Sequence, residues 1–200
     1  MNRREVIQRT ALALGYAIST PALLAVLKGC KASPNLSYTP VFFNKEQALL
    51  VSTLAEIIIP RTTTPGAIDA GVPAFIDLLL KEVYIAAEQE KFLNGLIGFD
   101  EECEKTYGNK FNDCSTEEQM AFFKKNHDEA IAKAGTGGTT GWWNAGKEEE
   151  KPFILKVKEL TLLGFFTSEP GATQVLQYKQ VPGPYQGCVP LAQVGKAWAT

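Results

Sequence analysis

Few side chains in this 200-residue chain are of a type that could support catalysis. His127 is the only histidine. It lies at helical spacing among apolar residues, where a histidine is more often a hydrogen-bonded core residue than a ligand or a base. It could act as a base together with a carboxylate, but the sequence places no nucleophile or orienting partner beside it. No cluster of cysteine and histidine has the spacing of a metal site. The sequence therefore predicts no catalytic, cofactor-binding or metal-binding residue in this chain.

A glycine-rich segment, residues 135–146, superficially resembles a phosphate-binding loop. It lacks a preceding strand and the Lys-Ser/Thr ending that such a loop needs, so we interpret it as an ordinary loop. Trp142 and Trp143 within it have two interpretations. Both rings can pack in the core, or they can anchor a partner protein, since tryptophan is enriched at interface hot spots.

The four cysteines are the other reactive groups, and none belongs to a Cys-x-x-Cys-His haem-attachment motif. Cys103 and Cys114 flank a predicted turn and could close a short disulfide loop if the chain is exported. If Cys30 is lipidated, Cys188 is left over. Such a cysteine is either a contact with a partner or a buried free thiol.

The N-terminal 29 residues have the layout of an export signal. Arg3 and Arg4 form a twin arginine ahead of a mildly apolar run, residues 11–27, which indicates the twin-arginine translocase; the alternative is an ordinary signal peptide. The run ends in Leu27-Lys28-Gly29-Cys30, which resembles a lipobox apart from Lys28. Lipidation of Cys30 would anchor an exported, periplasmic protein to the membrane, and residues 30–43 would then form a tether.

The charge balance argues against nucleic-acid binding. Residues 1–29 hold four of the 20 basic and one of the 22 acidic residues, so the remainder has 16 basic and 21 acidic residues, a net charge of −5. A nucleic-acid-binding protein needs a basic surface. The hydrophobic fraction of 45% is enough for a folded core.

Residues 57–77 organise the body of the chain. An apolar helical run stops at Pro60, and Val72-Pro73 opens a second run, because proline is favoured just inside a helix start. We predict a structured loop between the two helices. Its key residues are Pro60, Arg61, Thr64, Pro65 and Gly66.

The remaining pattern predicts a mostly α protein: one helical domain over residues 44–168, with long structured loops. Capping boxes at Asn44 and Ser115 mark helix starts. Further helices are expected over residues 86–107 and 151–167, although Gly95 and Gly98 weaken the first. In the helix after Ser115, one apolar stripe is formed by Met120, Phe123, His127, Ile131 and Ala134.

Residues 169–200 are rich in proline, glycine and aromatic residues and are expected to form an extended tail. Such a tail cannot form its own core, so it packs on this domain or on a partner. Together with the two tryptophans, Tyr185 and Cys188 are therefore candidate interface residues.

Two motifs resemble the gluconate 2-dehydrogenase subunit 3 family, over roughly residues 44–191. The first contains Ile58-Ile59-Pro60, Thr62, Thr64-Pro65-Gly66-Ala67, Ala70-Gly71-Val72 and Phe75-Ile76-Asp77. The second contains Gly164-Phe165-Phe166-Thr167-Ser168, Val181-Pro182-Gly183, Tyr185, Gly187-Cys188 and Pro190-Leu191. A difference is Thr63, where the family commonly carries an acidic residue.

The resemblance implies a small, mostly helical, non-catalytic subunit that carries the export signal for an exported dehydrogenase and stabilises it. The large subunit would be a flavoprotein of the glucose-methanol-choline type, holding FAD and the sugar or sugar-acid site, and a cytochrome c subunit would accept electrons. Two alternatives from the residues alone are a stand-alone lipoprotein, binding a small ligand at Trp142, Trp143 and the Arg61 loop, and an enzyme that uses His127.

Overall fold

The first described helix begins at the predicted cap. The computed structural model describes residues 36–134, 151–181, 183–184 and 187–199, and helix α2 spans Lys45–Ile58. The Gln47 N–H donates to Asn44 Oδ1 at 2.9 Å, and the Asn44 N–H donates to Gln47 Oε1 at 3.0 Å. This reciprocal pair satisfies two N–H groups that a helix start leaves unpaired, and it confirms the predicted capping box.

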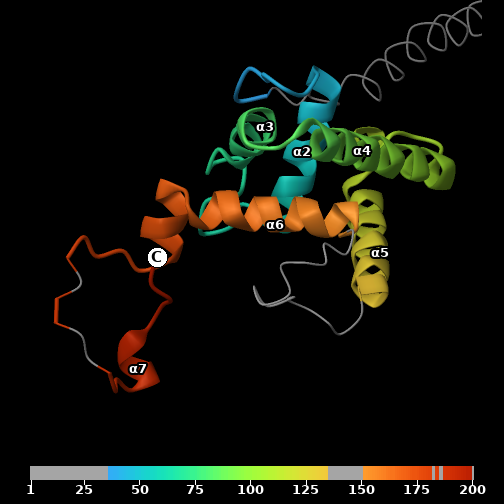
Figure 1. Ribbon diagram of the computed structural model, residues 1–200. Helices are drawn as coiled ribbons and strands as arrows, with labels where there is room; N and C mark the ends of the chain where they lie inside the picture. The colour runs from blue at the N-terminus through green and yellow to red at the C-terminus, as the bar shows by residue number, and fades with distance from the viewer. Residues whose placement is uncertain (1–35, 135–150, 182, 185–186, 200) are drawn as a thin grey trace, which may run out of the picture. The chain divides into compact units, whose positions relative to one another are not determined.

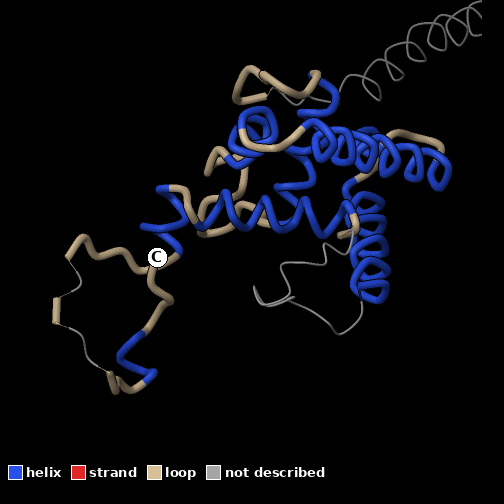
Figure 2. The backbone as a smooth tube through the Cα atoms, in the orientation of Figure 1, coloured by secondary structure: helices blue, strands red, loops and turns tan. Residues whose placement is uncertain are grey.

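The other described elements are also helices, so the predicted mostly α fold is confirmed (Figures 1 and 2). In chain order they are α3 (Val72–Glu82), α4 (Ala86–Tyr107), the 3₁₀ turn η1 (Phe111–Asp113), α5 (Thr116–Ala134), α6 (Phe153–Phe166), the π-turn η3 (Gly171–Val175) and α7 (Leu191–Val194). Within the described residues the extended pairing is limited to an isolated bridge between Gln177 and Trp198. These residues all belong to one unit that begins at Leu36.

Helix α6 is the centre of the packing, since it contacts α2, α3, α4 and α5 (Figure 1). Its sequence is apolar on nearly every side, as expected of a helix surrounded by other helices. The buried face of α6 comprises Ile154, Val157, Leu160, Thr161, Gly164 and Phe165. The Thr161 hydroxyl donates to the Val157 carbonyl oxygen at 2.8 Å, which satisfies a polar group in the core.

Six phenylalanines link the helices around one end of α6. They come from three helices (α4, α5 and α6), from η1 and from the segment before α2, and neighbouring ring centroids lie 5.0–6.2 Å apart. Tilted and edge-on aromatic contacts at this separation are favourable beyond the area that they bury. The six are Phe43, Phe92, Phe99, Phe111, Phe122 and Phe153.

Helix α4 continues through both glycines that weakened its prediction. A Cβ at Gly95 would lie 2.6 Å from Phe153 Cδ2, so glycine there allows α6 to approach α4 closely. The gain in aromatic packing outweighs the low helix propensity of one glycine. The helix ends as predicted at Gly108, which has a φ of 76° and therefore the left-handed conformation that glycine adopts without strain.

Helix α5 begins as expected at the Ser115 capping box: the Ser115 N–H donates to Glu118 Oε2 at 2.8 Å. The apolar stripe of α5 is not its core face, because Met120 and Ile131 are 53% and 48% exposed. Phe122 and Ala130 are buried instead. The spacing was helical, but Phe122 reaches the aromatic cluster, and this contact rotates the stripe away from the core.

Asp77 fixes the segment that precedes α2. It lies on the buried face of α3 and is only 1% exposed. Its carboxylate accepts the backbone N–H groups of Val41, Phe42 and Phe43 at 2.7, 3.1 and 2.8 Å. Such bonds to a buried carboxylate are strong and offset its loss of hydration. The end of the expected tether is thus held against α3, and Phe43 is buried in the core.

After α6 the chain turns through η3, and Gln177 then pairs with the segment around Trp198 near the C-terminus. The Gln177 N–H donates to the Ala197 carbonyl at 2.8 Å, and the Ala199 N–H donates to the Gln177 carbonyl at 2.8 Å. The Gln177 side chain also donates to the carbonyls of Val194 and Lys196. Apolar side chains remain exposed along this tail: Tyr178, Val181, Val189 and Trp198.

Candidate functional site

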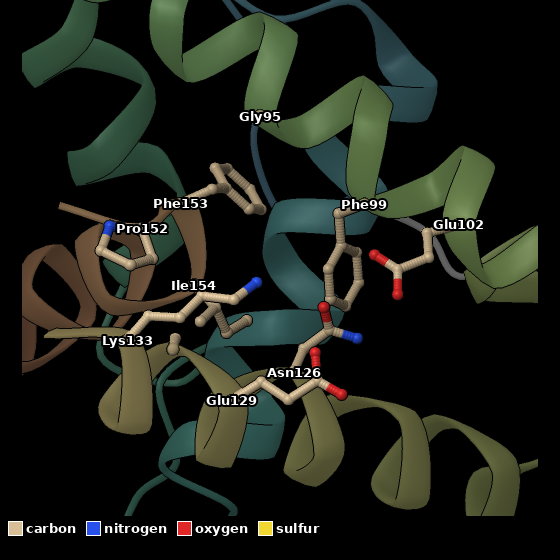
Figure 3. Close-up of a pocket in the computed structure, with 10 residues that line it drawn as sticks. Gly95, Phe99, Glu102, Asn126, Glu129, Lys133, Pro152, Phe153 and Ile154 are labelled. Carbon is tan, nitrogen blue, oxygen red and sulfur yellow. The ribbon is translucent and has the colours of Figure 1, made fainter. Parts of the chain in front are cut away.

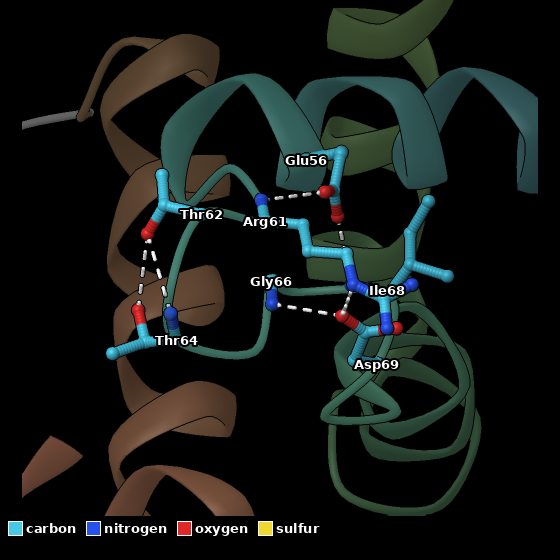
Figure 4. A network of polar contacts seen from close by, with 7 residues as sticks. All are labelled: Glu56, Arg61, Thr62, Thr64, Gly66, Ile68 and Asp69. Carbon is cyan, nitrogen blue, oxygen red and sulfur yellow. Dashed lines mark hydrogen bonds and ion pairs between the residues drawn. The ribbon is translucent and has the colours of Figure 1, made fainter. Parts of the chain in front are cut away.

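The loop between α2 and α3 is held by Glu56, a residue that the sequence analysis did not single out. One carboxylate oxygen accepts the N–H of Arg61 at 2.9 Å, and the other accepts the N–H of Ile68 at 3.1 Å (Figure 4). The Ala67 N–H donates to the Ile59 carbonyl at 2.9 Å. Both ends of the loop are therefore joined to the end of α2. A lone acidic residue in the last turn of an apolar helix was the available signal.

A second carboxylate, Asp69, closes the other side of the loop. It accepts the Gly66 N–H at 3.1 Å, and its Oδ2 lies 3.2 Å from Arg61 Nε. The Arg61 side chain is 74% exposed, so the pair is solvent-screened and contributes little to stability by itself. The signal for Asp69 was its place three residues after a glycine in a turn, a spacing at which aspartate often bonds the local backbone.

Gly66 is fixed by close packing rather than by backbone freedom. A Cβ there would lie 2.5 Å from Glu56 Oε1 and 2.7 Å from the backbone nitrogen of Arg61. Either contact would push apart the groups that hold the loop. The loop is therefore held by hydrogen bonds to Glu56, and the close approach of Glu56 and the Arg61 nitrogen requires glycine at position 66.

The apex of the loop is a threonine turn that faces solvent. The Thr62 N–H donates to the Thr64 carbonyl at 3.0 Å, and the two hydroxyl oxygens are 3.3 Å apart. Thr63 between them is exposed. The apex presents hydroxyl and methyl groups without an acidic side chain, in contrast to the pattern noted for Thr63 in similar sequences.

His127 lies at a polar contact between α5 and α6. Its Nε2 is 2.9 Å from Lys158 Nζ, and its Nδ1 is 3.5 Å from Asp128 Oδ1. An ammonium group can only donate, so Nε2 accepts and the ring proton lies on Nδ1, toward Asp128. The imidazole is 19% exposed and stacks on Phe123. This arrangement positions the ring between two helices rather than against a nucleophile.

An apolar groove lies where the exposed stripe of α5 meets the end of α2. It has a volume of about 390 Å³. Ile57, three residues before Pro60, contributes its α2 side. The α5 lining residues are Met120, Ala121, Phe123, Lys124 and His127. Apolar hollows with a few polar groups at the rim are typical sites for a side chain of a ligand or partner.

A second, more polar cavity of about 260 Å³ lies between α4, α5 and the start of α6 (Figure 3). Phe99, Phe153 and Ile154 form its apolar part. Around them lie the polar side chains Glu102, Asn126, Glu129 and Lys133. Arg61 lines neither cavity. Within the described parts of the chain, no three His, Cys, Asp or Glu side chains gather as a metal site would require.

The structure brings Cys103 and Cys114 together and leaves Cys188 apart. The first two sulfurs are 3.6 Å apart, as buried thiols. Burial, together with the Cys114 contact, raises the pKa of Cys103 to about 12. Cys188 is exposed. The other predicted site residues lie outside the described ranges: Arg3, Arg4, Cys30, Trp142, Trp143 and Tyr185.

None of the helices in the described ranges is both long and apolar enough to cross a membrane. The family model of gluconate 2-dehydrogenase subunit 3 matches residues 45–183, or 139 of the 200 residues. The match begins with α2, includes the Glu56 loop, the apolar groove and the polar cavity, and ends before Cys188 and α7. Comparison with curated proteins and with solved structures found no match to this chain.

Proposed function

The chain belongs to the gluconate 2-dehydrogenase subunit 3 family, and from that premise we propose that it is a non-catalytic subunit that binds, stabilises and escorts the catalytic subunit of an exported dehydrogenase. The family match over residues 45–183 carries this proposal. The catalytic partner is a FAD-dependent flavoprotein of the glucose-methanol-choline type, which oxidises a sugar or sugar acid. A cytochrome c subunit takes the electrons.

The exposed apolar surface of this chain supports a role in binding another protein. Large apolar side chains stay exposed at the groove and along the tail, for example Met120, Tyr178 and Trp198. At the groove Met120 lies with Ile57 and Phe123, and contiguous apolar surface commonly marks an interaction site. Cys188 on the exposed tail is then a candidate contact with the partner.

The N-terminal sequence supports the proposed role in export. Arg3 and Arg4 address the chain to the twin-arginine translocase, which carries folded proteins, so a flavoprotein that binds FAD before export can travel with it. Lipidation at Cys30 would then hold the pair at the membrane on the periplasmic side.

The first experiment tests binding and export together. This chain is co-expressed with a flavoprotein of the proposed type, taken from a neighbouring reading frame where one is found there, and both are followed in periplasmic and cytoplasmic fractions. We expect the two to co-purify, and Arg3→Lys with Arg4→Lys to retain both in the cytoplasm. The matched control is Arg9→Lys, which leaves the pair of arginines intact. A flavoprotein that is exported without this chain, or that never binds it, would overturn the proposal.

A second experiment locates the contact on α5. Met120→Lys places a charge in the groove, whereas Ile131→Lys changes a similarly exposed side chain of the same helix that is absent from the groove lining. We expect Met120→Lys to reduce co-purification at least tenfold, because a charge desolvated in an apolar contact costs more than about 1.4 kcal/mol. Equal losses in the two variants would exclude the groove as the contact. The partner-free chain should not oxidise gluconate or glucose.

A further inference from the structure

We propose that Cys103 and Cys114 form a disulfide on oxidation, which we call the clip. Both are thiols when the chain folds in a reducing compartment, and they become a disulfide when the chain meets a disulfide oxidant. The two Sγ atoms lie 3.6 Å apart, and both side chains are buried. A disulfide needs about 2 Å between the sulfurs. The two sulfurs, already in contact at 3.6 Å, therefore have to approach by only about 1.6 Å.

The neighbouring contacts already hold both cysteines in place for bond formation. Cys103 lies on the buried face of α4, and Cys114 follows η1 directly. Between them, the Phe111 N–H donates to Asp100 Oδ1 at 2.8 Å, and its carbonyl accepts from Gln119 Nε2 at 2.8 Å. Phe111 itself is fully buried. The turn between the cysteines is thus anchored on both sides before any covalent bond forms.

The order of the two exchange steps follows from exposure. Cys114 is 8% exposed, whereas Cys103 is fully buried. Cys114 Sγ therefore attacks the disulfide of an oxidant such as oxidised glutathione and releases one glutathione thiol. Cys103 Sγ then attacks Cys114 Sγ and releases the second. Two S–H bonds break and one S–S bond forms in the chain, and the two electrons and two protons reduce the oxidant to two thiols.

The clip is a property of this chain and does not rest on the proposed partner. The disulfide crosslinks α4 to the turn that precedes α5 and so restricts the unfolded chain. A closed loop of this length is expected to raise the melting temperature by about 5–10 °C.

The test uses the full chain, purified under a thiol reductant and then incubated with oxidised glutathione. Trypsin cleaves after Lys105 and Lys110, between the two cysteines, so a disulfide joins the peptides 92–105 and 111–124. We expect this linked pair to dominate, and thiol reductant to lower the melting temperature of the oxidised chain. The control variant Cys188→Ser should behave in the same way, whereas the melting temperature of Cys114→Ser should not respond to reductant.

Two results would overturn the clip. One is recovery of Cys103 and Cys114 as alkylatable thiols after oxidation and denaturation. The other is a different product: glutathione retained on Cys114, or Cys114 joined to Cys188. The peptide map of the unmutated chain decides between these outcomes even if Cys114→Ser fails to fold.

Discussion

Asp77 and Glu56 hold two loops by the same chemistry in different surroundings. Each carboxylate accepts backbone N–H groups of a loop: Asp77 from three successive residues before α2, and Glu56 from both ends of the loop after it. Asp77 is 1% exposed on the core face of α3. Glu56 lies at the surface end of α2, where water competes for the same hydrogen bonds.

The two carboxylates therefore hold different kinds of segment: Asp77 holds a segment against the core, whereas Glu56 holds a loop that remains accessible to solvent. In the core a carboxylate that loses its partners has no water to replace them, so Asp77 and the segment that it binds form one unit. The Glu56 loop has a second carboxylate, Asp69, and leaves the threonine apex exposed. A loop that is fixed at its base and free at its apex is suited to contact with a partner.

The largest effect is expected from Asp77→Asn. The amide replaces one acceptor oxygen by a donor that faces backbone N–H groups in the core, so we expect a loss of about 3 kcal/mol in the free energy of unfolding. Chemical denaturation measures this value. The control is Asp128→Asn, whose side chain is 62% exposed and whose change should cost less than about 0.5 kcal/mol. A loss below about 1 kcal/mol for Asp77→Asn would show that the buried carboxylate is not needed to hold the segment before α2.

Gly66→Ala tests the loop by packing instead of charge. The new Cβ would lie 2.5 Å from Glu56 Oε1 and 2.7 Å from the Arg61 nitrogen, so we expect a loss of about 2 kcal/mol. Gly98→Ala is the matched control, because no atom lies within 4 Å of its Cβ position in α4. Removing glycine from a helix interior should stabilise by about 0.5–1 kcal/mol. The same sign for both variants would show that the close contact at Gly66 is relieved at no cost.

The sequence predicted the elements better than the contacts that fix them. Local signals sufficed for the caps at Asn44 and Gly108, because a cap is decided within a few residues. The roles of Glu56 and Asp77 depend on N–H groups up to 36 residues away, which no local pattern contains. The stripe on α5 has a related explanation: its spacing is helical, but the contacts of Phe122 determine which side of the helix meets the core.

Glu56→Gln is expected to have a smaller effect than Asp77→Asn and to act on different amides. The glutamine can still accept one N–H, and the site is near water, so we expect a loss of about 1 kcal/mol. Hydrogen exchange distinguishes the two regions. In Glu56→Gln the amides of Arg61 and Ile68 should exchange faster, with those of residues 41–43 unchanged. If both sets of amides exchange faster to the same degree, the two segments are coupled, and Glu56 and Asp77 do not hold them independently.

The smallest effect on stability is expected for a third carboxylate, that of Glu118 in the capping box of α5. Hydrogen bonds from the Ser115 N–H and hydroxyl hold the pKa of Glu118 below its ordinary value of 4.5. Because the folded pKa is lowered, the stabilisation is complete above the unfolded value and is lost as the pH falls through the folded one. Between about pH 6 and pH 3, the wild-type chain should therefore lose slightly more stability than Glu118→Gln. Glu117→Gln removes the same charge from the same turn without altering the cap, and it should keep the wild-type slope. Equal slopes in both variants would mean that the hydrogen bonds from Ser115 to Glu118 add nothing measurable to stability, in contrast to those that the buried Asp77 accepts.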